Sequence, residues 1–206
     1  MFNESKCETV VLKAMRIITR RGGIIRTSDA IRAGIHPRTL YFLRDTGVLE
    51  RLSRGLYRLA DLPALSEPDL VTVAARIPRA VICLFSALSF HDLTTQIPHW
   101  VYIALEKGAE TPRIDYPPIK VHRFSKNAFS LGHERQSIDG VEVRIYNPEK
   151  TLADCFKFRN RIGIDVALEA IKLYKERGSS KWDDVLKYAR VCRIENVIRP
   201  YLEAIL

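Results

Sequence analysis

The sequence has few cysteines, and none of them has the spacing of a zinc site. The four cysteines, at positions 7, 83, 155 and 192, form no Cys-x-x-Cys pair, and none lies within five residues of a histidine. Structural zinc sites of the usual spacing are therefore excluded. Cys83 and Cys155 lie in apolar segments, so we expect them to be buried free thiols that behave as small hydrophobic side chains. We expect a reduced, cytoplasmic protein.

Long apolar segments are missing as well. The amino-terminal residues MFNESK lack the apolar region of a signal peptide, and no stretch approaches 18 uninterrupted apolar residues. The sequence therefore predicts neither secretion nor a membrane-spanning helix.

The motifs that identify most enzyme reactions are absent. There is no P-loop, Gly-x-Gly-x-x-Gly, Gly-x-Ser-x-Gly or His-Glu-x-x-His motif, so we expect no cofactor, no metal and no catalytic residues. A metal-dependent nuclease built on Asp115, Glu142 and Lys150 is an alternative. It lacks the usual Glu-x-Lys, because Arg144 follows Glu142 at that spacing and arginine is a poor base. The scattered histidines are predicted to be polar or hydrogen-bonded core residues rather than ligands; they are His91, His99, His122 and His133.

Acidic residues are scarce at the start of the chain, where most of the net charge lies. Residues 1–60 contain 12 Lys and Arg but only 5 Asp and Glu, so they carry +7 of the total formal charge of +9. The whole chain has 47% hydrophobic and 28% charged residues, which is typical of globular proteins. The uneven charge predicts two domains, the first of them with a polyanionic partner.

The spacing of apolar residues predicts three helices in this basic segment. The first covers residues 4–21 and ends at Gly22-Gly23, and a short extended piece follows at 24–26. Thr27 is predicted to cap a second helix over residues 28–33. A turn at 34–36 leads to a third helix over 37–46, with proline at its first position. Two short helices around a turn form a helix-turn-helix pattern.

A basic hairpin follows the third helix directly. Residues 48–52 and 56–59 are predicted strands, and residues 53–55 are the turn between them, with Gly55 where a positive φ is needed. A hairpin in this place is the wing of a winged-helix DNA-binding domain, so we assign residues 1–60 to such a domain.

The remainder of the chain predicts a second, mixed domain. Pro63 and Pro68 mark a linker over residues 61–68, and residues 69–206 then form the α+β domain. Its helices are predicted at 69–76, 80–91, 148–159, 165–177, 182–190 and 194–206, and its strands at 100–105, 119–124 and 136–145, the last folded about Asp139-Gly140.

Polar side chains at the start of the third helix can reach base edges in the major groove, where each base pair has its own hydrogen-bonding pattern. Leu40 and Leu43 are expected to face the first helix. Tyr41 and Phe42 then point outwards to thymine methyl groups or sugars, or alternatively pack locally. The wing arginines are expected to contact phosphates or the minor groove. The start of the second helix is expected to bind a phosphate. The predicted DNA-binding residues are Thr27, Ser28, His36, Arg38, Thr39, Tyr41, Phe42, Arg51, Ser53, Arg54 and Arg58.

Lys150 and Asp154 have the i, i+4 spacing of an ion pair on the predicted helix 148–159. Asn147 is predicted to cap this helix. The pair is either a surface pair or involves a partly buried structural carboxylate, because Asp154 lies among apolar neighbours.

The chain resembles the AbiEi family of antitoxins. The segments that carry this resemblance are residues 34–41 (GIHPRTLY), 49–57 (LERLSRGLY), 84–91 (LFSALSFH) and 148–154 (PEKTLAD). The resemblance spans nearly the whole chain.

The resemblance implies a repressor of its own operon that also counters a neighbouring nucleotidyltransferase-like toxin in a type IV toxin-antitoxin, abortive-infection system. It assigns operator binding, at inverted repeats in double-stranded DNA, to Arg38, Thr39, Tyr41, Arg51 and Arg54, and antitoxicity to the second domain. The alternatives are the metal-dependent nuclease, delivered to DNA by the winged helix, and a nonspecific nucleic-acid binder.

Overall fold

The structure is a computed structural model that describes residues 4–205, with side chains described from residue 9 onwards. Its contacts divide the chain into two compact units. The first comprises Met1–Pro78, Arg113–Pro117 and Ser137–Val143, and the second comprises Arg79–Pro112, Pro118–Gln136 and Arg144–Leu206. The predicted linker, residues 61–68, falls inside the first unit, and the domain boundaries drawn from the sequence stay a prediction.

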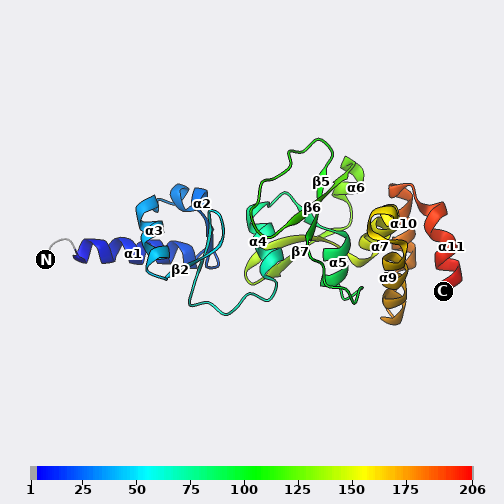
Figure 1. The fold of residues 1–206 in the computed structure, drawn as a ribbon, viewed down its shortest axis with the longest axis horizontal. Coiled ribbons are helices and arrows are strands. Elements are labelled where there is room, and N and C mark those ends of the chain that lie inside the picture. Colours follow the sequence, from blue (N-terminus) through cyan, green and yellow to red (C-terminus); the bar gives the residue numbers. More distant parts are fainter. Residues whose placement is uncertain (1–3, 206) are drawn as a thin grey trace. The chain divides into compact units, whose positions relative to one another are not determined.

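The amino-terminal part of the first unit is a winged helix, as predicted (Figure 1). A three-stranded sheet of order β1-β3-β2 accompanies its helices, and both strand pairs are antiparallel. The elements follow in the order α1 (Glu4–Thr19), β1 (Ile24–Arg26), α2 (Thr27–Arg32), α3 (Pro37–Asp45), β2 (Leu49–Ser53) and β3 (Leu56–Leu59). The predicted α+β fold with an amino-terminal winged helix is therefore confirmed.

One apolar core holds these elements together. Ile18 of α1 and Leu40 and Leu43 of α3 are fully buried, and they pack with residues of β1, α2, β2 and β3. Full burial of a leucine or isoleucine contributes about 1.5–3 kcal/mol, so this core fixes α3 against the other two helices. The predicted inward direction of Leu40 and Leu43 is confirmed.

The predicted cap of the second helix is wrong. The helix begins at Thr27 itself, and the capping position is Arg26, whose side chain makes no capping hydrogen bond. The Thr27 hydroxyl instead donates to the Gly55 carbonyl at 3.4 Å, and the Thr27 amide donates to the same oxygen at 2.9 Å. The wing turn therefore uses the group that the sequence assigned to the helix, since β1 and β3 bring Thr27 beside Gly55. The first unit also contains α4 (Pro68–Arg76), which packs against β1 and β3.

A five-stranded mixed sheet forms the centre of the remaining chain. Its order is β6-β5-β4-β8-β7, with β4 antiparallel to β5 and parallel to β8, and with β5 parallel to β6. Its members are β4 (Val81–Ile82), β5 (Val101–Glu106), β6 (Ile119–Phe124), β7 (His133–Ile138) and β8 (Val141–Tyr146). The predicted turn at Asp139-Gly140 joins β7 to β8, as expected.

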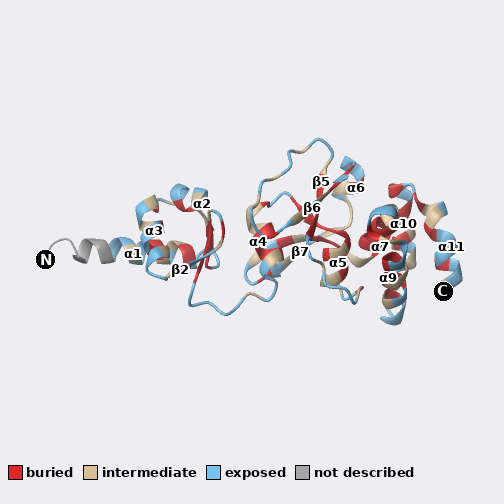
Figure 2. Cartoon of the chain, in the orientation of Figure 1, coloured by how far each residue is buried: buried red, intermediate tan, exposed pale blue. Residues whose placement is uncertain are grey.

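The helices of the second unit pack around α7, whose residues are almost all buried (Figure 2). Asn147 Oδ1 accepts from the Lys150 amide at 2.9 Å, which confirms the predicted cap. The helices are α5 (Leu84–Phe90), α6 (Lys126–Ser130), α7 (Pro148–Lys157), α8 (Arg159–Ile162), α9 (Ile164–Glu176), α10 (Trp182–Cys192) and α11 (Glu195–Ile205). In residues 4–205 none of the helices has the length and apolar character that a membrane crossing requires.

The predicted helix over residues 80–91 is wrong in its first part. Val81 and Ile82 form the central strand β4, and Cys83 is extended, with φ −145° and ψ 175°, so α5 begins only at Leu84. An apolar run of this length fits a buried strand as well as a helix, because both faces of a central strand are covered. The predicted burial of Cys83 and Cys155 is confirmed.

Candidate nucleic-acid interface

The amino-terminal end of α3 is open and is organised by His36. His36 is exposed and is the capping residue of α3, where its Nδ1 accepts a hydrogen bond from the Arg38 amide at 3.2 Å. A neutral imidazole nitrogen that accepts a hydrogen bond carries no proton, so the ring proton lies on Nε2. The cap therefore presents an N–H donor at the start of α3, which can bind a phosphate or a base acceptor.

Arg38 and Thr39 extend this polar end. Arg38 is exposed, and in the part of the chain that the structure describes no carboxylate lies within ion-pair distance of it. Thr39 is half-buried, and its amide donates to the His36 carbonyl at 3.0 Å. An unpaired guanidinium at the start of a recognition helix can make the two parallel hydrogen bonds that distinguish guanine.

Tyr41 and Phe42 lie on the outer face of α3 with 42% and 48% of their surface exposed. The guanidinium of Arg44 lies over the Tyr41 ring, 5.1 Å from its centroid, and Arg44 pairs with Asp45 at 2.7 Å. Neither ring belongs to the core, since Leu40 and Leu43 fill the inner face. These two solvent-exposed aromatic rings are available for contacts to thymine methyl groups and sugars.

The wing presents Arg51 and Arg54, and both are exposed. The Arg51 guanidinium lies 3.6 Å from the Asp115 carboxylate, and the Arg54 amide donates to both oxygens of that carboxylate at 3.3 Å. Burial acts to raise the pKa of Asp115, but backbone amides, that of Arg54 among them, and the charge of Arg51 lower it below its usual value. A phosphate that contacts Arg51 therefore competes with this carboxylate.

Arg58 and Ser53 do not reach the surface that the sequence assigned to them. Arg58 is 5% exposed, and its guanidinium pairs with Glu50 at 2.5 Å and donates to the Pro63 carbonyl. Ser53 is 4% exposed and points inwards at the β-bulge of β2. The ion pair of Arg58 follows from the strand register, because Arg58 of β3 lies directly opposite Glu50 of β2 and the two side chains share one face of the sheet. Arg58 thus ties the hairpin to the segment that follows it.

The start of α2 offers less to an anion than the sequence suggests. Ser28 is exposed, but Thr27 is engaged by Gly55, as described above. The Asp29 carboxylate lies in the first turn and pairs with Arg26 at 2.6 Å and with Arg32. This carboxylate already interacts with the positive end of the helix, where a phosphate would have to bind.

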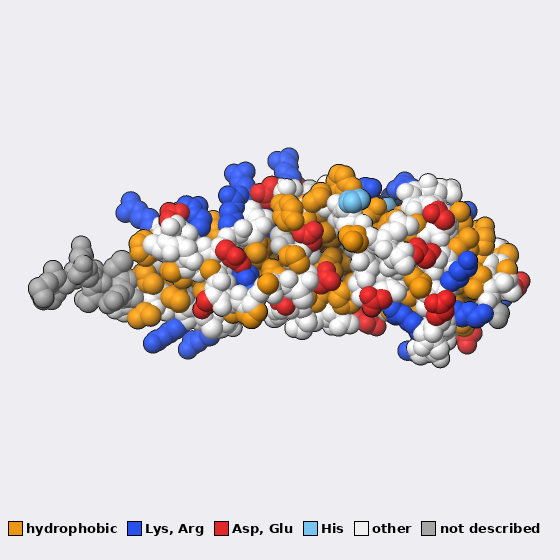
Figure 3. All heavy atoms as spheres, turned by 60° about the horizontal axis from the view of Figure 1, so that its bottom comes forward, with side chains coloured by type: hydrophobic (Ala, Val, Ile, Leu, Met, Phe, Trp, Pro, Cys, Tyr) orange, Lys and Arg blue, Asp and Glu red, His pale blue; other side chains and the backbone are white. Residues whose placement is uncertain are grey.

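Figure 3 shows Lys and Arg side chains projecting from the surface of the winged-helix part. Those without a carboxylate nearby are the ones free to bind phosphate. On α3 the cation without a carboxylate nearby is Arg38, whereas Arg44 is paired. Arg26 of β1, Arg32 of α2 and Arg58 of β3 are paired as well.

The residues of the nuclease alternative have other contacts. Asp115 contacts the wing, and Lys150 is fully buried, with its ammonium 2.5 Å from Asp154. Within residues 4–205 no group of three His, Cys, Asp or Glu side chains is arranged to hold a metal ion.

Nothing in the sequence indicates that Asp115 is a neighbour of the wing. Sixty-one residues separate it from Arg54, and no local pattern announces the contact. The pairing of Arg58 is equally hidden, because a basic residue in a wing strand predicts a DNA contact whether its side chain points outwards or inwards.

The sheet order β1-β3-β2, the packed helix α3 and its exposed polar amino-terminal end together define a winged-helix protein. Residues 13–60 match a family model described as transcriptional regulator, AbiEi antitoxin. The resemblance seen in the sequence is thereby confirmed over the winged-helix segment, and the match ends at residue 60. No curated protein matches the chain.

Proposed function

We propose that the protein is a sequence-specific, double-stranded-DNA-binding repressor of its own operon, without enzymatic activity of its own. The observation that carries this proposal is the exposed surface of α3, which presents His36, the unpaired Arg38 and the rings of Tyr41 and Phe42. The match of residues 13–60 to a family of transcriptional regulators supports it. The same family resemblance motivates the second proposed role, that of an antitoxin.

The proposed contacts divide into two kinds. His36, Arg38, Thr39, Tyr41 and Phe42 on α3 read bases in the major groove, where the donor and acceptor pattern differs between base pairs. Arg51 and Arg54 on the wing, with Ser28 of α2, contact the backbone and set the register. Operators are expected to be inverted repeats, because two copies related by a twofold axis read the two half-sites.

Arg38→Ala tests the reading role of α3. We expect binding to the DNA upstream of the protein's own gene to weaken by about 1–3 kcal/mol, roughly 5- to 150-fold, and binding to a random duplex of equal length to change much less. Arg54→Ala on the wing should weaken binding to both duplexes alike. It should also reduce the slope of log binding constant against log salt concentration by about one. Fluorescence anisotropy across a salt series, with and without magnesium, measures both effects.

The matched control is Arg177→Ala, which removes the same charge from an exposed position at the end of α9. Equal binding of the wild-type protein to both duplexes would leave a nonspecific binder and would refute the operator proposal. Metal-dependent cleavage of the duplex would instead favour the nuclease.

The antitoxin role predicts protection of cells from the toxin encoded beside this gene, a nucleotidyltransferase-like protein on the family resemblance. With the toxin expressed from an unrelated promoter, we expect the wild-type protein to restore growth. The Arg38→Ala variant should restore growth to the same extent, because neutralisation is assigned to the second domain rather than to α3. Colony counts measure the effect.

The unrelated promoter separates neutralisation from repression, since the protein cannot switch that promoter off. Failure of the wild-type protein to restore growth would refute the antitoxin role and would leave the repressor proposal intact. Restored growth by the wild type but not by Arg38→Ala would place protection in the winged helix.

A further inference from the structure

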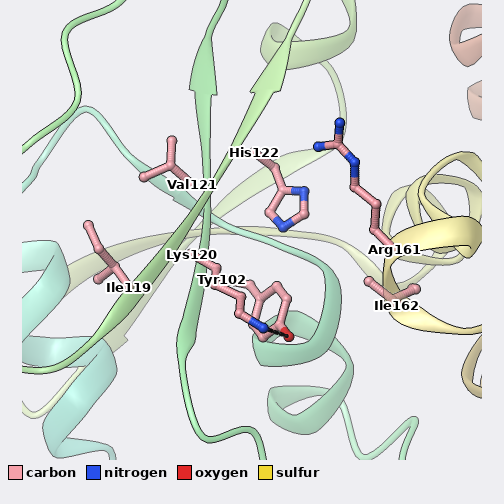
Figure 4. A pocket seen from close by; sticks show the side chains of 7 residues that line it. All are labelled: Tyr102, Ile119, Lys120, Val121, His122, Arg161 and Ile162. Carbon is pink, nitrogen blue, oxygen red and sulfur yellow. Dashed lines mark hydrogen bonds between the residues drawn. The ribbon is translucent and has the colours of Figure 1, made fainter.

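The second unit contains a cavity at the edge strand β6. It has a volume of about 430 Å³, within the usual range for small-molecule sites. Strand pairing builds one of its walls, because Tyr102 of β5 lies directly opposite Lys120 of β6 and Ala104 lies opposite His122. Lys120 and His122 are two residues apart on β6 and so share one face. Arg161 and Ile162 of α8 form another wall (Figure 4).

Two cations line this cavity without a carboxylate to neutralise them. Lys120 and Arg161 are both exposed, and among the described side chains no Asp or Glu lies within 4.0 Å of either charge. The Lys120 ammonium lies 3.3 Å from the Tyr102 hydroxyl and 5.3 Å from the centroid of the Trp100 ring. In Figure 4 the Arg161 guanidinium lies on one side of the His122 ring, and the Lys120 ammonium lies on the opposite side, next to the Tyr102 hydroxyl.

His122 lies between these cations and has an unused polar atom. The residue is 6% exposed, and its Nδ1 has no hydrogen-bond partner within the described residues. His122 is thus a buried polar residue, one of the two alternatives predicted from the sequence, and this nitrogen is not hydrogen-bonded to any described residue. The ring is fixed by Tyr102, which stacks on it at 5.7 Å, and by Phe158, whose edge-on contact is at 5.0 Å.

The charge around His122 is uniformly positive. Burial first, and then the charges of Arg161 and Lys120, lower its pKa from 6.5 to about 4, so the ring is neutral at pH 7. A buried polar atom without a partner costs free energy unless a ligand or water satisfies it. An anion beside the His122 ring can satisfy that nitrogen and offset the positive charge of the cavity.

We propose that this cavity binds the phosphate group of a small molecule, either inorganic phosphate or a phosphate monoester, through Arg161 and His122, with Lys120 adding positive charge from the other side of the ring. Two positive charges match the charge of a phosphate near neutral pH. Arginine offers the paired donors that fit phosphate oxygens, and lysine supplies a point charge. Neutral His122 can donate from a ring nitrogen, and the lining residue Ile162 offers an apolar contact to an organic part.

Isothermal titration of the full-length protein with inorganic phosphate, adenosine 5′-monophosphate and adenosine tests this proposal. We expect one site for the phosphate-bearing probes and no binding of adenosine. Tighter binding of the monophosphate would identify an ester as the ligand class, and equal binding would identify inorganic phosphate. Arg161→Gln should weaken binding tenfold or more, and Lys120→Gln should weaken it less, because the Lys120 ammonium lies on the other side of the ring. Lys187→Gln, an exposed lysine of α10 outside the cavity, should change it less than twofold.

A second readout follows His122 directly. Its pKa, followed by NMR, should rise when the phosphate probe binds, because the anion offsets Arg161 and Lys120, the two charged groups that lower it. The proposal is overturned if neither phosphate probe binds more tightly than about 1 mM. It is also overturned if Lys187→Gln weakens binding as much as Arg161→Gln.

The outcome is separate from that of the DNA-binding proposal, because Arg38→Ala should leave phosphate binding unchanged. If no small probe binds while Arg161→Gln weakens DNA binding, the two cations contact the nucleic-acid backbone and the small-molecule site is refuted.

Discussion

Lys150→Met is expected to destabilise the second unit by about 3–5 kcal/mol, because it leaves the Asp154 carboxylate without its counter-charge in the core. Both side chains are 0% exposed and lie 2.5 Å apart on α7. The Lys150 ammonium also lies 4.4 Å from the centroid of the Tyr146 ring and 5.0 Å from that of Phe124. Besides Lys150, Asp154 receives a hydrogen bond from the Cys192 thiol at 3.4 Å. The measurement is denaturant unfolding followed by tryptophan fluorescence, since both tryptophans, Trp100 and Trp182, lie in this unit.

The destabilisation should depend on pH. Burial raises the pKa of Asp154, and Lys150 opposes that rise by its charge and its hydrogen bond. Removing Lys150 therefore raises the pKa of Asp154 in the folded state further above its pKa in the unfolded chain. A carboxyl with a raised folded-state pKa costs no stability below its unfolded pKa of about 4, and the cost grows as pH rises towards the folded value. We expect the difference in unfolding free energy between Lys150→Met and the wild type to become smaller as pH falls.

The double variant Lys150→Met, Asp154→Ala is the control, and it also covers the case in which the single variant fails to fold. It removes both charges, so no unpaired carboxylate stays in the core. We expect it to be more stable than Lys150→Met alone and to lose the pH dependence of this difference from the wild type. A double variant as unstable as the sum of the two single variants would show that the pair contributes through packing and not through charge.

The winged helix was predictable because its signals are local. Glycines at turns, proline at the start of α3 and the apolar spacing of Leu40 and Leu43 act over a few residues, and the structure confirms each element within about two residues. The Lys150–Asp154 pair was also visible as an i, i+4 spacing, although its complete burial depends on α5, α9 and α10 packing around α7.

The features that the sequence did not predict depend on contacts between distant segments. The direction of Arg58 depends on Glu50 and on the segment around Pro63, and Asp115 meets the wing from 61 residues away. The cavity at β6 needs the register of β5 with β6 and the approach of α8, so Lys120, His122 and Arg161 appear unrelated along the chain. Strand β4 has only two residues, which are too few to show the alternation of apolar and polar residues that indicates a strand.

Leu40→Ala and Tyr41→Ala separate the structural face of α3 from its proposed reading face. Leu40 is 0% exposed in the core of the winged helix, so its truncation should cost about 2–5 kcal/mol. Unfolding free energies are about 0.05–0.15 kcal/mol per residue, so a loss of this size is a large part of the stability of so small a core. We expect loss of hydrogen-exchange protection in α3 and loss of operator binding together, while the tryptophan transition of the second unit stays unchanged.

Tyr41→Ala should weaken operator binding without loss of hydrogen-exchange protection in α3. Tyr41 is 42% exposed and touches Arg44 rather than the core, so the protection of α3 should stay close to that of the wild type. Operator binding should nevertheless weaken, because a base or sugar contact is lost. If Tyr41→Ala lowers protection as much as Leu40→Ala, the ring is a packing residue and the outer face of α3 is not the reading surface. Unchanged protection with unchanged binding would remove Tyr41 from the interface and leave recognition to Arg38, His36 and Thr39.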